Sequence, residues 1–451
     1  MVQLRVLLTS MDGQGHVNAI LGVAGVLSKA GHHIIISLSK GWEKLIKANG
    51  YEFVPIVNEG DVDEKDMNNN PDEKTEKKAA NEGAFEFFKQ LLTSIRKDPI
   101  TALEEFEDRV CTTYLNWSTE MLKFDEPLKK SIEKINPDII IIDYLVKLPC
   151  LIKGSIPWVS LWSCSPVALY RGRVPPEGTG FPLDSPQELW KKYYDLHFKA
   201  YKPVRDNVNK KLIEAGVEPY RDDQWIYLLE SPYMNIYNYP ECLDYTEVGP
   251  KPDKWYRMDA VIREPDDKTP FSLPDNLVEK PGALIYFSLG SMGCVDLELM
   301  KRVISVCAKS PHRFIISKGP YHEQIELPDN MWGERYVNQI AILPHVDLVI
   351  THGGNNTLTE SLYFGKPVIV LPLFYDQLDN AQRIQDKKLG IRLDTYSFTD
   401  EQLLDGIEKL LNDMELYDKL ERISFEMRNT KTREEIVKLI EKTAITKKSP
   451  E

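Results

Sequence analysis

Apolar and polar positions follow two periods that alternate along most of the chain. Unbroken apolar runs of strand length recur, separated by stretches with an apolar residue every three or four positions. The unbroken runs are typical of parallel strands covered on both faces, and the second period indicates amphipathic helices. In the first half, strands are predicted at residues 5–10, 33–38, 138–143 and 155–162, with a helix at about 17–30. The pattern therefore predicts an α/β fold built on parallel sheets.

Three longer stretches interrupt the short alternating units. Residues 85–122 and 185–215 have helical spacing and many aromatic side chains. Residues 59–82 are acidic and polar and predict a solvated loop. Asp61 and Asp63 in this stretch match a metal-binding Asp-x-Asp pattern, but that pattern belongs at the end of a strand. We therefore interpret these two carboxylates as solvated.

A chain of 451 residues is too long for a single hydrophobic core. The second half repeats the strand pattern at 283–289, 313–317, 348–351 and 367–371, and irregular proline-rich sequence lies before it. The predicted organisation is a first domain at 1–245, a linker at 246–281, a second domain at 282–425 and a last helix at 426–451.

Composition narrows the class of protein. Hydrophobic residues make up 42% and charged residues 28%, which is ordinary for a globular protein. The net charge of −13 argues against nucleic acid or an anionic membrane as the main partner. Six scattered cysteines without a Cys-x-x-Cys pair indicate reduced thiols and no zinc site. Neither a signal-peptide pattern nor an apolar run of membrane-spanning length is visible. We therefore expect a soluble, monomeric cytoplasmic protein.

The most informative stretch runs from Tyr336 to Gln377. A buried strand leads into a loop with His352 and Gly354, and a helix opens near Asn356. Another strand follows, with Asp376 and Gln377 just past its end. Glycines let the backbone approach an anion, and a helix N-terminus presents unpaired N–H groups to it. The stretch predicts a nucleotide-sugar site, although the same glycines could be the turn residues of an ordinary βαβ unit.

This stretch resembles the donor-binding signature of the family 1, UDP-dependent glycosyltransferases. The signature runs from an aromatic residue and Gln, through His-x-Gly-x-Asn-Ser and Glu, to Asp-Gln. The matching positions are Tyr336, Gln339, His352, Gly354, Asn356, Thr357, Glu360, Asp376 and Gln377. The chain departs from the pattern at Tyr336, where the family has Trp, and at Asn338, where it has Pro. Tyrosine covers less of a base, which puts the donor affinity in doubt.

The resemblance covers most of the second domain and a few short motifs of the first. It implies the GT-B fold, in which two Rossmann-like, doubly wound domains face each other across a cleft. It also implies that the last helix returns to the first domain. By this resemblance Tyr336 would stack on uracil, and Gln339 would bond the uracil and ribose region. His352 and the amides after it would hold the diphosphate, and Glu360 would take the ribose hydroxyls.

The resemblance assigns the sugar end of the donor as well. Asp376 and Gln377 would bind the hydroxyls of the transferred sugar, which favours UDP-glucose as donor. Ser291, in Phe287-Ser288-Leu289-Gly290-Ser291, would touch the diphosphate. Ser163 would reach the transferred sugar. Both serines could equally be helix caps.

His16 is the candidate catalytic base and Asp143 its partner. His16 stands at the start of the first helix in Gly13-Gln14-Gly15-His16, where the helix N-terminus disfavours extra positive charge. We therefore expect a neutral imidazole that can accept a proton. Asp143 ends its strand and could bond His16 Nδ1. Both positions match the catalytic pair of the family, and the alternative is two capping residues.

The acceptor pocket is expected mainly in the first domain. Large apolar side chains there suit a flat hydrophobic alcohol or phenol, as in detoxification of xenobiotics or modification of flavonoids. The candidate liners are Met11, Phe85, Phe88, Trp190, Tyr194, Phe198 and Trp225. At helical spacing, such residues are more often core.

The predicted activity is inverting, metal-independent transfer of a hexose to an acceptor hydroxyl. Two other functions stay open at this point. A UDP-sugar epimerase on a similar scaffold would convert the donor without an acceptor. A non-catalytic carrier of hydrophobic ligands would bind acceptors but would not need His16.

Overall fold

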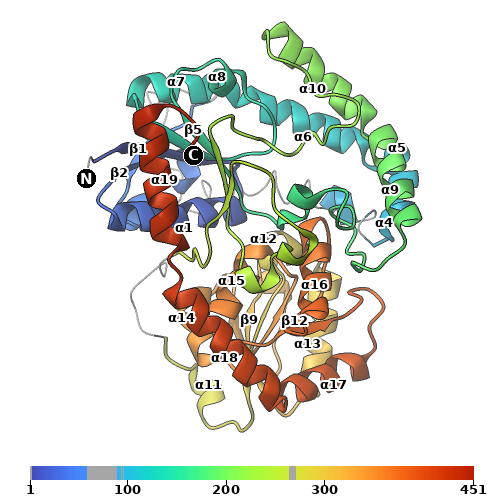
Figure 1. The fold of residues 1–451 in the computed structure, drawn as a ribbon. Coiled ribbons are helices and arrows are strands. Elements are labelled where there is room, and N and C mark those ends of the chain that lie inside the picture. The colour runs from blue at the N-terminus through green and yellow to red at the C-terminus, as the bar shows by residue number, and fades with distance from the viewer. Residues whose placement is uncertain (1–2, 58–88, 93, 95, 264–270, 451) are drawn as a thin grey trace, which may run out of the picture.

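The computed structural model describes residues 3–57, 89–92, 94, 96–263 and 271–450. The acidic stretch 59–82 and two predicted acceptor residues, Phe85 and Phe88, lie outside them. The described part of the chain forms two parallel sheets, one of seven strands and one of six, each flanked by helices (Figure 1). The predicted architecture of two doubly wound α/β domains is confirmed.

The first sheet has the order β3-β2-β1-β4-β5-β6-β7, and every pair of neighbours is parallel. Its strands are β1 (Arg5–Ser10), β2 (His33–Leu38), β3 (Glu52–Pro55), β4 (Ile139–Asp143), β5 (Trp158–Trp162), β6 (Met234–Tyr237) and β7 (Trp255–Arg257). Strand order reverses between β1 and β4, so the loops that follow these two strands diverge and leave space for a site. Strand β7 lies inside the range predicted as linker, and the first domain therefore extends past residue 245.

The described helices of the first domain differ from the predicted ones in where they begin and end. They are α1 (Gln14–Lys29), α2 (Glu43–Ala48), α4 (Pro99–Glu104), α5 (Phe106–Arg109), α6 (Cys111–Lys123), α7 (Asp125–Ile135), α8 (Pro149–Ile152), α9 (Gln187–Ala200) and α10 (Lys202–Glu214). The predicted helix at 185–215 breaks at Tyr201, before the proline in the first turn of α10. Proline is tolerated there because the N–H it lacks has no partner within a helix.

The second sheet has the order β10-β9-β8-β11-β12-β13 and is also parallel throughout. Its strands are β8 (Leu284–Ser288), β9 (Arg313–Ser317), β10 (Met331–Glu334), β11 (Leu348–Thr351), β12 (Val368–Val370) and β13 (Gly390–Arg392). Its helices are α11 (Asp275–Val278), α12 (Gly290–Gly293), α13 (Leu297–Cys307), α14 (Gln339–Ile342), α15 (Asn355–Tyr363), α16 (Asp376–Asp386) and α17 (Asp400–Leu411). Strand order reverses between β8 and β11, which repeats the plan of the first domain.

The last two helices connect the domains. Helix α18 (Met414–Asn429) runs along the second domain, and α19 (Thr432–Thr446) crosses to the first, where it lies beside α1 (Figure 1). Ile436 and Ile440 of α19 are buried in the same hydrophobic cluster as Ile20 and Val23 of α1. Burial of this apolar face attaches the end of the chain to the first domain.

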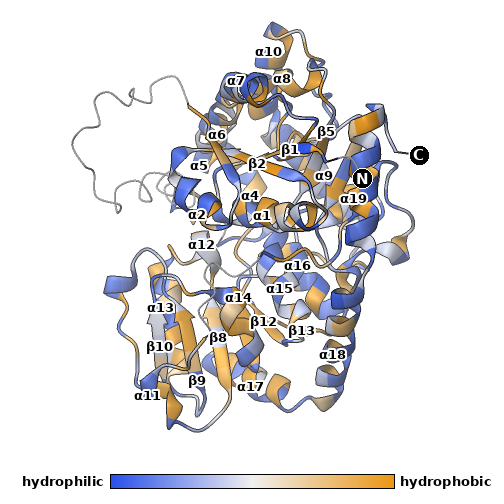
Figure 2. Cartoon of the chain, turned by 90° about the vertical axis from the view of Figure 1, so that its left-hand side faces the viewer, coloured by the Kyte–Doolittle hydropathy of each residue, from blue (hydrophilic) through white to orange (hydrophobic). Residues whose placement is uncertain are grey.

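Apolar strands fill the interior of both domains, as Figure 2 shows by their hydrophobic colour. Side chains of β4, the predicted isoleucine run, are at most 1% exposed. Such complete burial explains why the run lacks the alternation of a half-exposed strand. Within the described residues, no helix is both long enough and apolar enough to cross a bilayer.

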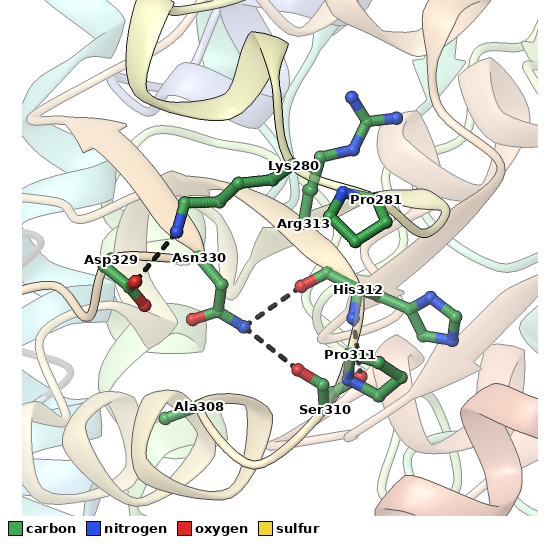
Figure 3. Close-up of a pocket in the computed structure, with 9 residues that line it drawn as sticks. All are labelled: Lys280, Pro281, Ala308, Ser310, Pro311, His312, Arg313, Asp329 and Asn330. Carbon is green, nitrogen blue, oxygen red and sulfur yellow. Dashed lines mark hydrogen bonds and ion pairs between the residues drawn. The ribbon is translucent and has the colours of Figure 1, made fainter.

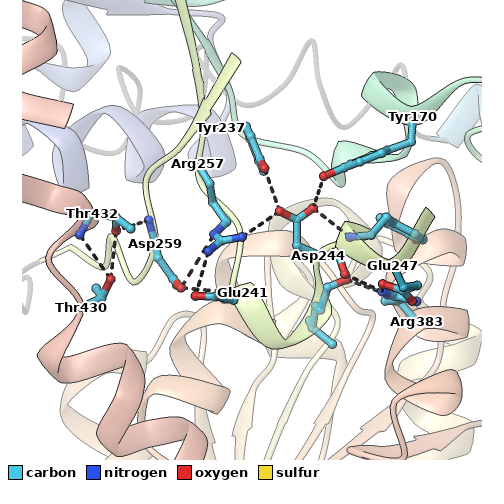
Figure 4. Close-up of polar contacts among 12 residues, drawn as sticks. Tyr170, Tyr237, Glu241, Asp244, Glu247, Arg257, Asp259, Arg383, Thr430 and Thr432 are labelled. Carbon is cyan, nitrogen blue, oxygen red and sulfur yellow. Dashed lines mark hydrogen bonds and ion pairs between the residues drawn. The ribbon is translucent and has the colours of Figure 1, made fainter. Parts of the chain in front are cut away.

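A buried polar network lies on the first-domain side of the junction (Figure 4). The carboxylate of Asp244, which is 1% exposed, accepts hydrogen bonds from Tyr170 (3.0 Å) and Tyr237 (2.7 Å). It also pairs with the Arg257 guanidinium at 3.0 Å. A charge this deeply buried is stable only because its oxygens are fully engaged.

Arg383 of α16 joins the second domain to this network. Its Nε donates to the carbonyl oxygen of Leu243 at 2.7 Å, and its guanidinium also contacts the Asp244 carbonyl and the Glu247 carboxylate. Burial raises the pKa of Glu247, but hydrogen bonds, chiefly from Arg383, outweigh it and lower that pKa to about 2. The ion pair therefore persists over the physiological range of pH.

Candidate active site

The reversal between β1 and β4 brings His16 and Asp143 together. Ser10 of β1 pairs with Asp143 of β4, and the Met11 N–H donates to the Asp143 carbonyl oxygen at 3.1 Å. The chain then turns through Gly13 into α1, whose third residue is His16. The distance from His16 Nδ1 to Asp143 Oδ2 is 2.8 Å. The two candidate catalytic residues are thus in direct contact, although 127 positions separate them.

Nearby carboxylates determine the direction in which the pKa of His16 is shifted. Its side chain is 22% exposed, whereas that of Asp143 is 1% exposed. Burial lowers the His16 pKa, but the charge and hydrogen bond of Asp143 and the charge of Asp376 outweigh burial and raise the pKa above 6.5. The prediction that the helix N-terminus keeps this pKa low is therefore wrong. The imidazole is a stronger base than expected, and its neutral form requires a correspondingly higher pH.

Asp143→Asn is expected to shift the pH dependence of any reaction that uses neutral His16. Since Asp143 raises the His16 pKa, its loss should lower that pKa. The rising limb of kcat/KM should then move to lower pH. Its plateau should fall by about 10²–10⁴-fold because the imidazole loses its orienting partner. Steady-state rates from pH 5 to 9 check this, and a limb that stays in place would contradict the pairing.

The reversal between β8 and β11 positions His352 in the same way. Ser288 of β8 pairs with Thr351 of β11, so the loops after both strands are neighbours. The His352 ring packs between two glycines, and a Cβ added at Gly290 or Gly354 would lie 2.5 Å from it. Gly290 also has a φ of +70°, which favours glycine. Burial lowers the His352 pKa to about 4, so the ring is neutral and would meet an anion as a hydrogen-bond donor.

The predicted uracil and ribose residues form one connected group. Tyr286 donates to Gln339 Oε1 at 3.1 Å, and Gln339 Nε2 donates to Thr357 Oγ1 at 3.3 Å and to the Glu360 carboxylate. Glu360 lies in α15 and its side chain is 3% exposed. Tyr336, three positions before Gln339 in the chain, is 46% exposed, and the Arg335 guanidinium lies 5.4 Å from its ring centroid. An exposed aromatic ring is the kind of side chain that can stack on a flat base.

The Asp-Gln end of the motif approaches the His16 site. Asp376 Oδ2 accepts from the backbone N–H of Ser165, in the first domain, at 3.3 Å. Burial raises the Asp376 pKa to about 6, opposed by the Ser165 N–H and the nearby His16. Gln377 Oε1 accepts from the N–H groups of Leu373 (3.2 Å) and Phe374 (3.4 Å), which fixes its amide.

Two asparagines at the start of α15 contact the first domain. Asn356 Nδ2 donates to the Gly15 carbonyl oxygen at 2.8 Å, next to His16. Asn355 Nδ2 donates to the carbonyl oxygens of Ser163 and Asn238, both at 2.8 Å. Asn355 was not predicted as a site residue, because only the fold shows that it faces the other domain. The two predicted serines also lie here. Ser163 Oγ is 3.3 Å from His16 Nδ1, and Ser291 follows Gly290 in α12.

The predicted acceptor aromatics on α9, together with Trp225 after α10, belong largely to packed clusters. Trp190 is buried and donates to Ser185 Oγ at 2.8 Å. Trp225 stacks on His197 with ring centroids 3.7 Å apart, and Tyr194 stacks on Phe198 at 6.1 Å. The Tyr194 hydroxyl and Trp225 Nε1 are buried, and no hydrogen bond to either appears among the residues with described positions. Of the described candidates, Met11 lies closest in the chain to the His16 loop.

A surface pocket lies at the opposite edge of the second sheet (Figure 3). It is lined by residues that precede β8, β9 and β10, including Lys280, His312 and Asn330. Ligands of such sheets bind beyond the carboxyl ends of the strands, so this pocket is not the candidate site. Among the described side chains, no group of three or more His, Cys, Asp or Glu is arranged to hold a metal ion.

Comparison with known proteins agrees with this geometry. The family model described as UDP-glucoronosyl and UDP-glucosyl transferase matches residues 276–426, which include the whole donor motif. NDP-glycosyltransferase YjiC of Bacillus subtilis is 22% identical over 94% of this chain and 93% of its own length. Human UDP-glucuronosyltransferase 2B28 is 30% identical over 29% of this chain. The chain spans 25% of the length of that human enzyme. A sterol 3-beta-glucosyltransferase of Candida albicans is 29% identical over 32% of this chain, which spans 10% of that protein's length.

Solved structures share the fold over the full length. The glycosyltransferase of kitacinnamycin superimposes with a TM-score of 0.67, covers 98% of this chain and 99% of its own, and is 18% identical. The calicheamicin glycosyltransferase CalG4 gives 0.62 with complete coverage of both chains and 17% identity. Residues 276–426 thus match the model of the UDP-glucoronosyl and UDP-glucosyl transferases, and the two-domain chain has the GT-B fold of the solved glycosyltransferases.

Proposed function

We propose that this glycosyltransferase transfers glucose from UDP-glucose to a hydroxyl group of a small hydrophobic acceptor, with inversion and without a metal. The observation that carries the proposal is the 2.8 Å contact between His16 Nδ1 and Asp143 Oδ2, with Asp376 close enough to influence the same imidazole. This arrangement supports the proposal because the proposed base and the proposed sugar-binding end of the donor motif would act at one place.

The proposed reaction begins at His16 Nε2, which remains available because Nδ1 faces Asp143. The neutral imidazole removes the proton of the acceptor hydroxyl as its oxygen attacks the anomeric carbon. The bond from that carbon to the UDP oxygen breaks on the opposite face, which inverts the configuration. Asp143 stabilises the imidazolium that forms. The charge that grows on UDP would be met by the His352 N–H and the N-terminus of α15.

The donor assignment has support at both ends. Tyr336, Gln339 and Glu360 offer a stacking face and hydrogen-bonding groups for a uridine. Asp376 offers a carboxylate that accepts bonds from the hydroxyls of a neutral hexose. No basic residue stands beside Asp376 and Gln377 in the sequence to attract the acidic group of a glucuronate, which favours glucose over glucuronic acid.

The acceptor and the cellular setting complete the proposal. A hydrophobic phenol, flavonoid or xenobiotic would lie on the first-domain side of His16, near Met11. All six cysteines are free thiols, which supports a reducing, cytoplasmic location. We propose that the protein acts there as a monomer.

The test is product analysis by mass spectrometry. The full chain would be incubated with a panel of phenolic alcohols and with UDP-glucose, UDP-glucuronate or UDP-galactose, in the presence of EDTA. Glycosylated acceptor from UDP-glucose is the expected result. Conversion of a UDP-sugar without acceptor would indicate an epimerase instead, and acceptor binding without any product would indicate a carrier. A strict requirement for Mg²⁺ would contradict the metal-independent mechanism.

Glu360→Ala is expected to weaken UDP binding by about 10–100-fold, because hydrogen bonds to a charged group contribute about 1.5–3 kcal/mol. Isothermal titration calorimetry with UDP measures the effect. Glu326→Ala, which removes a carboxylate elsewhere in the second domain, serves as the control and should bind UDP like the unmodified protein. Unchanged affinity after Glu360→Ala would remove the ribose assignment.

A further inference from the structure

Arg263 lies beside the residue assigned to the donor ribose. Its Nε is 3.7 Å from Glu360 Oε1, and the two side chains are 9% and 3% exposed. Arg263 belongs neither to the donor motif nor to the second sheet. It lies in the range predicted as linker, where no site residue was expected.

The backbone that carries Arg263 is attached to the first domain. After β7 the chain packs against α1, and the Val261 side chain is buried in the core of the first domain. The Val261 carbonyl oxygen accepts from Asn238 Nδ2 at 3.0 Å. A Cβ added at Gly22 of α1 would lie 2.8 Å from Val261 Cγ1, so this close approach depends on glycine. Arg263, two residues later, therefore reaches Glu360 from the side of the first domain.

The ion pair between Arg263 and Glu360 offsets the cost of burying the Glu360 carboxylate. A carboxylate as buried as that of Glu360 is costly unless a positive charge or several hydrogen bonds compensate it. The Gln339 amide supplies a hydrogen bond, and Arg263 supplies charge. Together they hold the carboxylate in a defined orientation. That orientation determines which oxygen lone pairs can accept from hydroxyl groups of a ligand.

We propose that Arg263 is a positioning residue of the donor site, which orients Glu360 for the ribose hydroxyls and links donor binding to the arrangement of the two domains. The proposal rests on the proposed function, since it requires that Glu360 binds ribose. Arg263 does not touch the reacting atoms and acts through Glu360. A donor that binds Glu360 is then linked to the second domain directly and to the first domain through Arg263.

The test compares UDP with 2′-deoxy-UDP by isothermal titration calorimetry. The unmodified protein is expected to prefer UDP by about 10-fold, the loss of one hydrogen bond to a charged acceptor. Arg263→Gln should reduce this preference to about 2-fold or less, as Glu360→Gln does. Arg263→Lys, which keeps the charge, should retain most of it. A purely structural role would weaken both nucleotides equally and leave their ratio unchanged.

Two further measurements distinguish a failure of the positioning role from a failure of the proposed function. In the Glu360→Gln background, Arg263→Gln should cause no additional loss of the UDP preference. Arg221→Gln, an exposed arginine paired with Asp223, is the matched control and should keep the full ratio. The positioning role is overturned if Arg263→Gln keeps the ratio of the unmodified protein, or if that protein does not distinguish the two nucleotides. Failure to bind either nucleotide would instead overturn the proposed function.

Discussion

Replacing His16 with alanine is expected to lower kcat by about 10²–10⁴-fold, which is the usual contribution of a positioned general base. UDP affinity should change by less than about 2-fold, because His16 belongs to the first domain and in the proposed mechanism contacts the acceptor. The separation of these two effects is the informative result. Steady-state kinetics with the best acceptor from the panel, together with calorimetry with UDP, measures both.

The matched control is His312→Ala. His312 lies at the far edge of the second domain, where its Nε2 is 2.9 Å from Glu408. Its loss should leave kcat unchanged. If His16→Ala retained full turnover, the base assignment would be wrong and the His16–Asp143 contact would be structural. If it lost UDP binding as well, His16 would be part of the donor site.

Asp244→Ala is expected to lower the free energy of unfolding by about 3–5 kcal/mol, because it removes the fully buried partner of Arg257, which is 13% exposed. Arg257 would keep only the 69% exposed Glu241 carboxylate at 2.8 Å and the Asp259 carboxylate at 4.0 Å. Two tyrosine hydroxyls lose an acceptor at the same time. The Asp244 segment also bonds Arg383, so the attachment of the second domain should weaken as well. Urea denaturation followed by tryptophan fluorescence should show a lower midpoint for the first transition.

Asp222→Ala provides the comparison for this stability effect. Asp222 also pairs with a buried arginine, Arg205, but its own side chain is 94% exposed. The arginine there keeps its bond to a backbone carbonyl oxygen, and water can replace the carboxylate. A change below about 1 kcal/mol is expected. Equal effects of the two substitutions would mean that burial of the Asp244 network adds nothing to stability.

Much of the fold was predictable because the apolar residues of a buried strand are consecutive in the sequence. The predicted strands at residues 5–10, 33–38, 313–317 and 348–351 coincide with β1, β2, β9 and β11. A parallel strand covered on both faces needs an unbroken apolar run, and few other structures do. Helix ends were less predictable. The predicted helix at 185–215 runs across Tyr201, although the aromatic positions end there and Pro203 follows in the first turn of α10.

The donor motif was also predictable, because its residues are close in sequence and local geometry carries their function. A loop with glycines that opens a helix approaches an anion in almost any α/β domain. The residues of the proposed acceptor site were much less predictable from the sequence. Aromatic residues of α9 have the same spacing whether they line a pocket or pack in a core. The stack of Trp225 on His197 joins residues that no local pattern relates.

By itself, the sequence determined the two parallel sheets, the donor motif and the identity of both candidate catalytic residues. Tertiary structure decided which charges meet. It brought Asp143 and Asp376 close enough to His16 to raise the pKa that the helix N-terminus was expected to lower. It also brought Arg263 from the first domain to Glu360 in the second. The physical reason is that electrostatic interaction depends on distance and burial, and neither is set by separation along the chain.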